Sequence, residues 1–445
     1  MGADGSQRAS AAIGRRVRGM VADTRPLAIP AYRRTFAGQT TATLGTMVTE
    51  VAVPVQIYAI TRSSLYVGLA GLAGLVPIII FGLYGGAVAD AMDRRRLCLC
   101  SSLVTWLVTL ALLAQAILGA RSAGLLLALV VVQSAGFAVS SSVQGAIVPS
   151  IVPVILVPAA NALSFTAGNV GEILGPLIAG VLVGLPHGFS YAYGADAVLF
   201  TAALYATFRL PALVPAASGR PGLRAVFDGL RFISGNPVLL MSFGVDIAAM
   251  VLAMPRALFP EAAALRFHGG VGLLYSSIAA GSVLAGLCSG WIGRVRRQGV
   301  ALTVAVIAWA TAIALAGFAR SLWLAVVFLA VAGAADLVSA VYRQTILQTY
   351  APDEMRGRLQ GVFTVVVTGG PRLADLRAGA MAAITTLTIA WSGMAVACIA
   401  IVAVAAVAVR PFWRYDARRV RDLAPVLPGT AGAAEGTGAA RGQGS

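Results

Sequence analysis

Charged side chains, histidine and cysteine are scarce in this sequence. Only 11% of its 445 residues are charged, against about a quarter in a typical soluble domain. The four cysteines and two histidines lack the spacing of a metal-binding motif, which argues against a zinc site. No phosphate-binding loop is present to indicate ATP as a driving force. The chain is instead 58% hydrophobic, a composition that excludes a soluble globular domain.

Long apolar runs account for most of the sequence. Because about 20 apolar residues cross a bilayer as a helix, they predict an all-α membrane protein with twelve transmembrane helices in two six-helix halves. The expected helices lie at 35–60, 65–89, 97–119, 122–148, 159–184 and 189–208, then at 238–258, 271–293, 299–318, 321–347, 358–384 and 387–409. The expected organisation is a cytoplasmic N-terminal segment at 1–34, an N-terminal half at 35–208, a cytoplasmic linker at 209–237, a C-terminal half at 238–410 and a disordered cytoplasmic tail at 411–445.

Lysine is absent, so all 33 basic residues are arginines, and the formal net charge is +16. A basic chain often binds nucleic acid, but the positions of these arginines indicate otherwise. In the twelve-helix arrangement the only arginines in loops on the outer side are Arg62, Arg121, Arg256, Arg266 and Arg320. This asymmetry predicts an inner (plasma) membrane protein with both termini in the cytoplasm. The positive charge then faces anionic membrane lipid, and we expect no nucleic-acid partner.

The two predicted halves share a short internal repeat. Gly86 and the arginines at 94–96 recur 200 positions later as Gly286 and the arginines at 294–297, whereas the carboxylate of Asp90 has no counterpart. Both copies fall between the second and third helices of a half. Paired halves with a central binding site are a common plan among transporters.

The first copy, GGAVADAMDRRRL, carries the pattern Gly-x-x-x-Asp-x-x-x-Arg-Arg in Gly86, Asp90, Arg94 and Arg95, with Asp93 beside it. It resembles the signature of the major facilitator superfamily, in which this loop latches the cytoplasmic sides of the two halves together. We expect Asp90 to dock in one state at the N-terminus of the helix that begins near 358. The alternative is that the arginines only anchor a cytoplasmic loop.

The fifth predicted helix contains GEILGPLIAG, with Gly171, Gly175, Pro176 and Gly180. This resembles a motif of proton-coupled drug exporters in the superfamily, although Ala179 replaces one glycine. Glycine and proline here permit a bend and a close helix contact. The alternative interpretation is a packing kink of a kind found in any membrane bundle.

Further segments, including VAVPVQIYAITRSS, PAANAL and LQTYAPDEMRGRLQGVF, make residues 30–410 similar to the enterobactin-exporter branch of the superfamily. The resemblance implies proton-driven export of siderophores or drug-like small molecules. One feature of many drug/proton antiporters is missing, because the predicted fourth helix contains no arginine. Proton coupling would therefore use other groups.

Ionisable residues inside membrane helices are costly unless paired, so each is a candidate for function. Glu50, Glu172, Asp246 and Asp336 lie in the middle of the first, fifth, seventh and tenth helices. In the fold that the sequence resembles, the first, fourth, seventh and tenth helices line the cavity, which favours Glu50, Asp246 and Asp336 as cavity carboxylates. Each is equally open to a structural role, and Asp336 has Arg343 as a possible partner seven residues on.

The eleventh predicted helix carries Arg372, Asp375 and Arg377. Arg372 and Asp375 have the spacing of an intrahelical ion pair, which leaves Arg377 to attract an anionic substrate group or a carboxylate elsewhere. The same charges could instead hold this helix against a neighbour. Asp196, in the sixth helix, is predicted to be structural.

The sequence thus predicts a secondary active transporter, not an enzyme, that needs no cofactor and works as a monomer. Its expected function is export of siderophore-like or lipophilic drug-like molecules by proton antiport. The alternative is a facilitator or importer without proton exchange. An intramembrane transferase would show clustered acidic or histidine metal motifs, and a receptor would need a recognition domain; the sequence contains neither.

Overall fold

The computed structural model describes residues 23–91, 94–209, 230–350 and 356–409, and these ranges contain helices but no strand. The α-helices whose bounds the structure describes are α2 Pro30–Thr61, α3 Ser64–Ala91, α4 Arg94–Ile117, α5 Ala123–Ile151, α6 Val157–Val183, α7 Gly188–Phe208, α9 Pro237–Ala253, α10 Phe259–Leu265, α11 Val271–Leu287, α12 Gln298–Phe318, α13 Leu322–Tyr350, α14 Arg356–Ile384 and α15 Met394–Ala408. Shorter turns of 3-10 helix lie at Arg25–Ala28, Val154–Leu156, Arg256–Leu258 and Ser289–Arg294, and a π-helical turn at Ile389–Gly393 leads into α15.

A helical segment occupies each of the twelve ranges expected from the sequence. Within the described ranges, nine segments are long and apolar enough to cross a membrane, and α11 is a shorter apolar helix of 17 residues. These findings confirm an all-α membrane protein, while the exact count of twelve crossings stays a prediction.

Several helix ends follow directly from side-chain chemistry. The Asn236 side chain accepts hydrogen bonds from the backbone N–H groups of Val238 (3.1 Å) and Leu239 (3.4 Å), and Pro237 occupies the first helical position, where no N–H is needed. At the other end of α9, Met254 precedes Pro255 and is extended (ψ 121°), because proline disfavours a helical conformation in the residue before it. The expected helix at 238–258 therefore ends at Ala253 and continues as a 3-10 turn and α10.

Two other boundaries bear on the expectations. The helix α2 begins at Pro30, five residues earlier than expected, and Tyr32 is buried with its hydroxyl donating to the carbonyl of Ala160 at 2.8 Å. Part of the segment expected at 1–34 thus belongs to the bundle. The predicted turn between the last two helices, at 385–389, is confirmed at 385–386.

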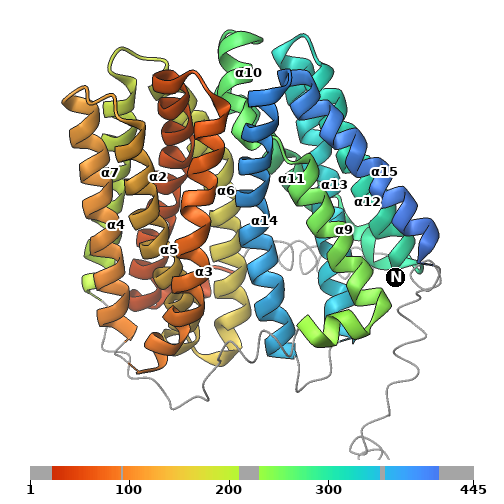
Figure 1. The fold of residues 1–445 in the computed structure, drawn as a ribbon. Helices are drawn as coiled ribbons and strands as arrows, with labels where there is room; N and C mark the ends of the chain where they lie inside the picture. Colours follow the sequence, from red (N-terminus) through yellow and green to blue (C-terminus); the bar gives the residue numbers. More distant parts are fainter. Residues whose placement is uncertain (1–22, 92–93, 210–229, 351–355, 410–445) are drawn as a thin grey trace, which may run out of the picture.

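The helices form two groups, α2–α7 and α9–α15, which lie side by side (Figure 1). Each group packs mainly within itself, and the two groups meet chiefly where α3 packs against α14 and α6 against α11. In this article the "α10 end" is the end of the bundle that carries α10, at the top of Figure 1. The "linker end" is the opposite end, where α7 ends and α9 begins.

Within the second group, α11 and α13 approach each other through glycine. A Cβ at Gly333 would overlap the backbone carbonyl of Ile278, and a Cβ at Gly281 would overlap that of Ala330. The hydroxyl of Ser282 donates to the carbonyl of Gly333 at 2.8 Å. Small residues drive helix association in membranes because they let backbones come this close.

We expect Gly333→Ala to destabilise the purified protein by about 1–3 kcal/mol, because the added methyl group forces α13 away from α11. Thermal unfolding in detergent measures the effect. The matched control is Gly168→Ala in α6, where a Cβ meets nothing within 4 Å. An equal melting temperature for both variants would contradict this account of the packing.

Candidate functional site

A cavity of about 480 Å³ lies between the two groups of helices. Its described lining comes from α2–α7 on one side and from α11, α14 and the 3-10 turn at Arg256–Leu258 on the other. Most lining residues are apolar, small or hydroxyl-bearing. The charged members are Glu50, Glu172, Arg256, Arg372 and Asp375. A mainly apolar pocket with a few convergent polar groups is typical of a small-molecule site.

An ion pair crosses the cavity from one group of helices to the other. Arg372 of α14 lies 3.6 Å from Glu50 of α2, measured from Nη2 to Oε1. The side chains are 30% and 45% exposed, so both charges face the open space of the cavity. Sequence reasoning paired Arg372 with Asp375 on its own helix, but in the structure the ion-pair partner of Arg372 is Glu50.

Asp375 lies one turn after Arg372 and also lines the cavity. It accepts a hydrogen bond from the backbone of Ala257 and interacts electrostatically with Arg372 and Arg256. Its Oδ1 atom is buried and has no hydrogen-bond partner among the described residues. The carboxylate is thus only partly satisfied in this state of the cavity.

Arg256 is a cavity residue that sequence reasoning assigned to an outer loop. It enters the cavity because α9 breaks at Met254–Pro255 and the chain turns inward as a 3-10 helix. The hydroxyl of Tyr275 donates to its carbonyl at 3.0 Å. Its guanidinium interacts electrostatically with Glu172 of α6. The sequence did contain a signal for this position, because Arg256 directly follows Pro255, a residue that interrupts an apolar helix.

Asp246 is not a cavity carboxylate, which corrects one expectation. It is buried in an ion pair with Arg343, itself only 6% exposed, and neither residue belongs to the described lining. The Oδ1 atom of Asp336 lies 3.8 Å from Nη2 of Arg343, which is the ion pair considered possible from the sequence. The Asp336 side chain is 45% exposed. It also interacts electrostatically with Arg256 and Glu172. A buried arginine needs such a partner because an isolated charge is costly in an apolar interior.

Arg377 makes backbone contacts rather than facing the cavity. Its guanidinium donates to the carbonyls of Val251 (3.0 Å), Met254 (3.0 Å) and Ala390 (3.1 Å). Two of these carbonyls lie at the broken end of α9, where helical partners are missing. The structure therefore gives Arg377 a place in holding the break, and it does not belong to the described cavity lining.

The four residues of the GEILGPLIAG motif lie where α6 contacts its neighbours on both sides. A Cβ at Gly171 would contact Thr43 of α2, and one at Gly175 would overlap Met47. On the other side, a Cβ at Gly180 would come within 2.9 Å of Gly272 at the start of α11. Pro176 lines the cavity, and its carbonyl leaves no room for a side chain on Gly272.

The two ends of the bundle differ. At the α10 end the halves are in contact, because the hydroxyl of Ser64 donates to Glu261 and the backbone of Ser64 packs against Gly379 of α14. Toward the linker end the cavity continues along the first half, past residues near the ends of four helices. These are Thr35 of α2, Cys98 of α4, Ile147 of α5 and Thr207 of α7. The halves are therefore in contact at the α10 end, and the cavity extends toward the linker end.

The expected gating latch falls largely outside the described side chains. Gly86, Asp90 and Arg94 are described only as helical backbone, and Asp93 lies outside the described residues. Arg95 is described: it donates to the carbonyl of Phe208 at 2.7 Å and lies 5.9 Å from the centre of the Phe208 ring. Arg95 thus ties the start of α4 to the end of α7, and the latch itself stays a prediction.

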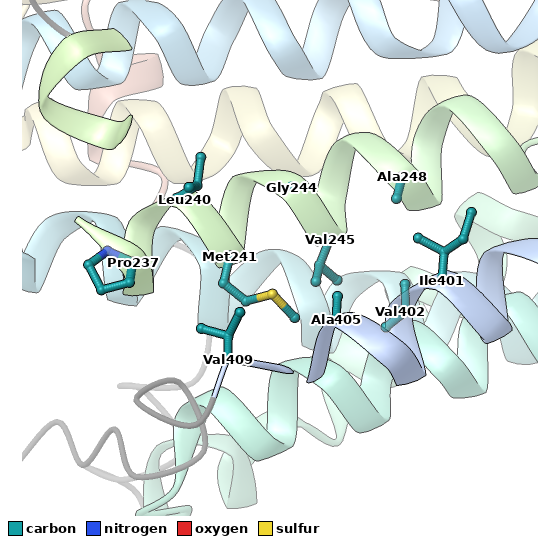
Figure 2. Close-up of a pocket in the computed structure, with 10 residues that line it drawn as sticks. All are labelled: Pro237, Leu240, Met241, Gly244, Val245, Ala248, Ile401, Val402, Ala405 and Val409. Carbon is teal, nitrogen blue, oxygen red and sulfur yellow. The ribbon is translucent and has the colours of Figure 1, made fainter. Parts of the chain in front are cut away.

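A second cavity, of about 300 Å³, lies between α9 and α15 (Figure 2). Its lining is apolar throughout, and Met241 and Val245 of α9 point toward α15, which contributes Val402 and Ala405 (Figure 2). None of the charged candidates lies there. We therefore place the functional site in the larger cavity between the halves.

Apolar helices in two groups around a charged central cavity define a membrane transporter. Residues 21–425 match the family model described as transmembrane secretion effector, and the chain belongs to this family of the major facilitator superfamily. It is a multi-pass transporter of the inner membrane, and its family is not one of enzymes.

The comparisons with individual proteins agree with this family. The enterobactin exporter EntS of Citrobacter koseri is 28% identical over 367 residues, which are 80% of this chain and 86% of that protein. The nucleoside transporter NupG has a similar fold, with a TM-score of 0.71, 12% identity and coverage of 86% of this chain and 100% of that one. A bacterial homologue of the lysosomal transporter Spinster, inward-facing and unoccupied, has a TM-score of 0.66, 16% identity and coverage of 90% and 99%.

We expect Gly272→Leu to open the α10 end, because its backbone touches Gly180 and Pro176 and cannot accommodate a side chain in the closed arrangement. Spin labels at Arg121→Cys and Arg320→Cys, one exposed loop position in each half, report the separation at this end. The four native cysteines are first replaced. The label distance should increase relative to the parent protein.

The control for this variant is Gly244→Leu in α9, where a Cβ meets nothing within 4 Å. It adds the same side chain to the wall of the apolar cavity of Figure 2. If the label distance were unchanged in Gly272→Leu, or increased equally in the control, the α6–α11 contact would not be what seals this end.

Proposed function

We propose that this protein exports siderophore-like or other lipophilic, drug-like small molecules from the cytoplasm in exchange for protons. The observation that carries the proposal is the Glu50–Arg372 ion pair, which joins the two halves inside the cavity at 3.6 Å. A charged contact between halves can change with each reorientation of the transporter. The relationship to enterobactin exporters supports the substrate class.

The chemistry of the cavity fits such a substrate. Its volume of about 480 Å³ lies in the range of about 300–1,000 Å³ that is usual for small-molecule sites. The carboxylates of Glu50, Glu172 and Asp375 accept hydrogen bonds from hydroxyl or ammonium groups. The arginines hold these carboxylates in place and can contact carbonyl or anionic oxygens of the ligand. Apolar walls contact the rest of the molecule.

The arginine distribution supports a cytoplasmic linker end. Arg33 and Arg34 of α2, Arg95 of α4 and Arg209 after α7 all lie at this end of the bundle, and positive residues favour the cytoplasmic side. On this orientation both termini are cytoplasmic, and the structure is the inward-facing state, open to substrate from the cytoplasm. We also propose that the protein works as a monomer surrounded by anionic lipid at this face.

Reorientation would exchange the contacts at the two ends. The α10 end would open as the Ser64–Glu261 and Gly180–Gly272 contacts separate, and the linker end would close. The latch predicted from Gly86, Asp90, Asp93, Arg94 and Arg95 would then hold the linker end. The same binding residues would face first one side of the membrane and then the other.

Protons drive the cycle in the outward direction. In the outward-open state, a proton from outside binds to a cavity carboxylate and removes its negative charge and most of its capacity to accept hydrogen bonds. The substrate is released outside as a result. After the return to the inward-open state, the carboxylate gives its proton to the cytoplasm and can bind a new substrate molecule.

We expect Glu50→Gln to weaken substrate binding by about tenfold or more, because a hydrogen bond to a charged group contributes about 1.5–3 kcal/mol. The assay uses everted membrane vesicles with an acidified interior and a dye that reports internal pH. Siderophores and lipophilic cations are added in turn. The native protein should deacidify the vesicles with one of these classes, and the variant should need a much higher concentration.

The matched control is Asp23→Asn, which neutralises a carboxylate outside the described cavity lining whose ion-pair partner among the described residues is Arg25. It should behave as the native protein does. If labelled compounds cross the membrane through the native protein while no compound moves protons, the antiport proposal fails. The protein would then be a facilitator or importer without proton exchange.

A further inference from the structure

A second acidic site lies in the first half, outside the described cavity lining. Asp196, in the middle of α7, is only 1% exposed. Its Oδ2 atom accepts hydrogen bonds from the hydroxyl groups of Thr49 of α2 (2.6 Å) and Thr109 of α4 (3.3 Å). Its Oδ1 atom has no hydrogen-bond partner among the described residues. One half of a buried carboxyl group is therefore unsatisfied.

The helix α2 is shaped to receive this carboxyl group. Gly45 lies one turn before Thr49, and a Cβ at Gly45 would overlap the Oδ1 atom of Asp196. The carboxyl group consequently packs directly against the backbone of α2. Its position is fixed by close packing and not by an ionic partner.

No cation balances Asp196 among the described residues. The elements packed against α7 are chiefly α2, α4 and α6, and the groups that face the carboxyl from α2 and α4 are the threonine hydroxyls. The other titratable group that interacts with it electrostatically is Tyr193, on the same helix. Tyr193 donates to Gln56 at 2.6 Å, and Gln56 and Gln115 exchange hydrogen bonds at 3.1 and 3.0 Å. That network is satisfied without Asp196.

A buried carboxylate without a neighbouring cation can lose its unfavourable charge by binding a proton. Thr49 bonds to Asp196 and also lines the central cavity, and the next residue on α2 is Glu50 of the ion pair. The Thr49 side chain, itself only 1% exposed, therefore lies between the buried carboxyl and the central cavity.

We propose that Asp196 is a proton-binding site of the transport cycle, loaded and emptied through the hydroxyl of Thr49. The carboxyl gives its proton to the Thr49 oxygen as Thr49 passes its own hydroxyl proton to water in the cavity. One proton leaves, the carboxylate keeps two hydroxyl donors, and the reverse transfer reloads it. This inference rests on the proposed proton exchange and adds a carrier that lies apart from the substrate.

The experiment uses the full-length protein with Asp196→Asn, in which the site is permanently uncharged. We expect substrate-triggered proton movement in everted vesicles to fall by at least about tenfold, as for loss of a positioned proton-transfer group. Exchange of labelled for unlabelled substrate, which needs no net proton movement, should persist. A merely structural role would lower both activities together.

Two further measurements keep the proposal open to refutation if Asp196→Asn folds poorly. Thr49→Val should slow proton movement, and Thr49→Ser, which keeps the hydroxyl, should restore it. Infrared difference spectra of the purified native protein between two pH values should show a carboxyl band that is absent in Asp196→Asn. Equal proton movement in Thr49→Val and Thr49→Ser, or an unchanged carboxyl band in the Asn variant, would overturn the assignment.

The outcomes also separate this inference from the proposed function. If the native protein moves no protons with any substrate, the exchange mechanism fails and the assignment fails with it. If the native protein and Asp196→Asn move protons equally well, the exchange mechanism stands and the assignment of Asp196 alone is wrong.

Discussion

The ion pair between Glu50 and Arg372 connects the two halves at the centre of the bundle. Its charges are partly exposed to the cavity, so the pair gains little from Coulomb attraction and loses little when it separates. The pair of Asp246 and Arg343 is different, because both residues are buried within one half. Breaking it would leave an uncompensated charge in an apolar interior. The partly exposed pair therefore joins the two halves, and the buried pair lies within one of them.

The broken backbone of α9 also depends on a charged side chain. The break in α9 brings Arg256 into the cavity, but it also leaves carbonyl groups without helical partners in a membrane environment. Arg377 satisfies two of them and links them to Ala390 ahead of α15. Irregular backbone is tolerated at this depth only where protein groups replace the missing hydrogen bonds. Arg377 thus stabilises the break in α9 that positions Arg256 in the cavity.

Much of the fold could be predicted from the sequence, because a bilayer leaves few alternatives for long apolar runs. The turn at 385–386 and the presence of charged residues in α14 could also be predicted from the sequence. The partners of the charges were not. Helices that are apolar on all sides carry no periodic signal for their rotation, so nothing in the sequence indicated that Asp246 faces Arg343 and that Glu50 faces Arg372.

The place of Arg256 in the cavity and the contacts of Asp196 were not evident from the sequence, for related reasons. Arg256 was assigned to a loop from hydropathy alone. Its place in the cavity depends on the turn of the chain at Pro255, and hydropathy does not report backbone conformation. Asp196 was predicted to be structural, and that remains a prediction. Its contacts come from Thr49 and Thr109, residues that are ordinary in membrane helices until their rotation is known.

The consecutive residues Thr49 and Glu50 give α2 a particular place in this arrangement. Successive side chains on a helix point about 100° apart, so one residue faces Asp196 inside the first half and the next faces Arg372 of the second. When the halves reorient, the contact of Glu50 with Arg372 must change, whereas that of Thr49 lies within a single half. The helix α2 therefore joins a contact that depends on the transport state to a buried acidic site. In the proposed proton exchange, that connection would couple proton occupancy to the orientation of the cavity.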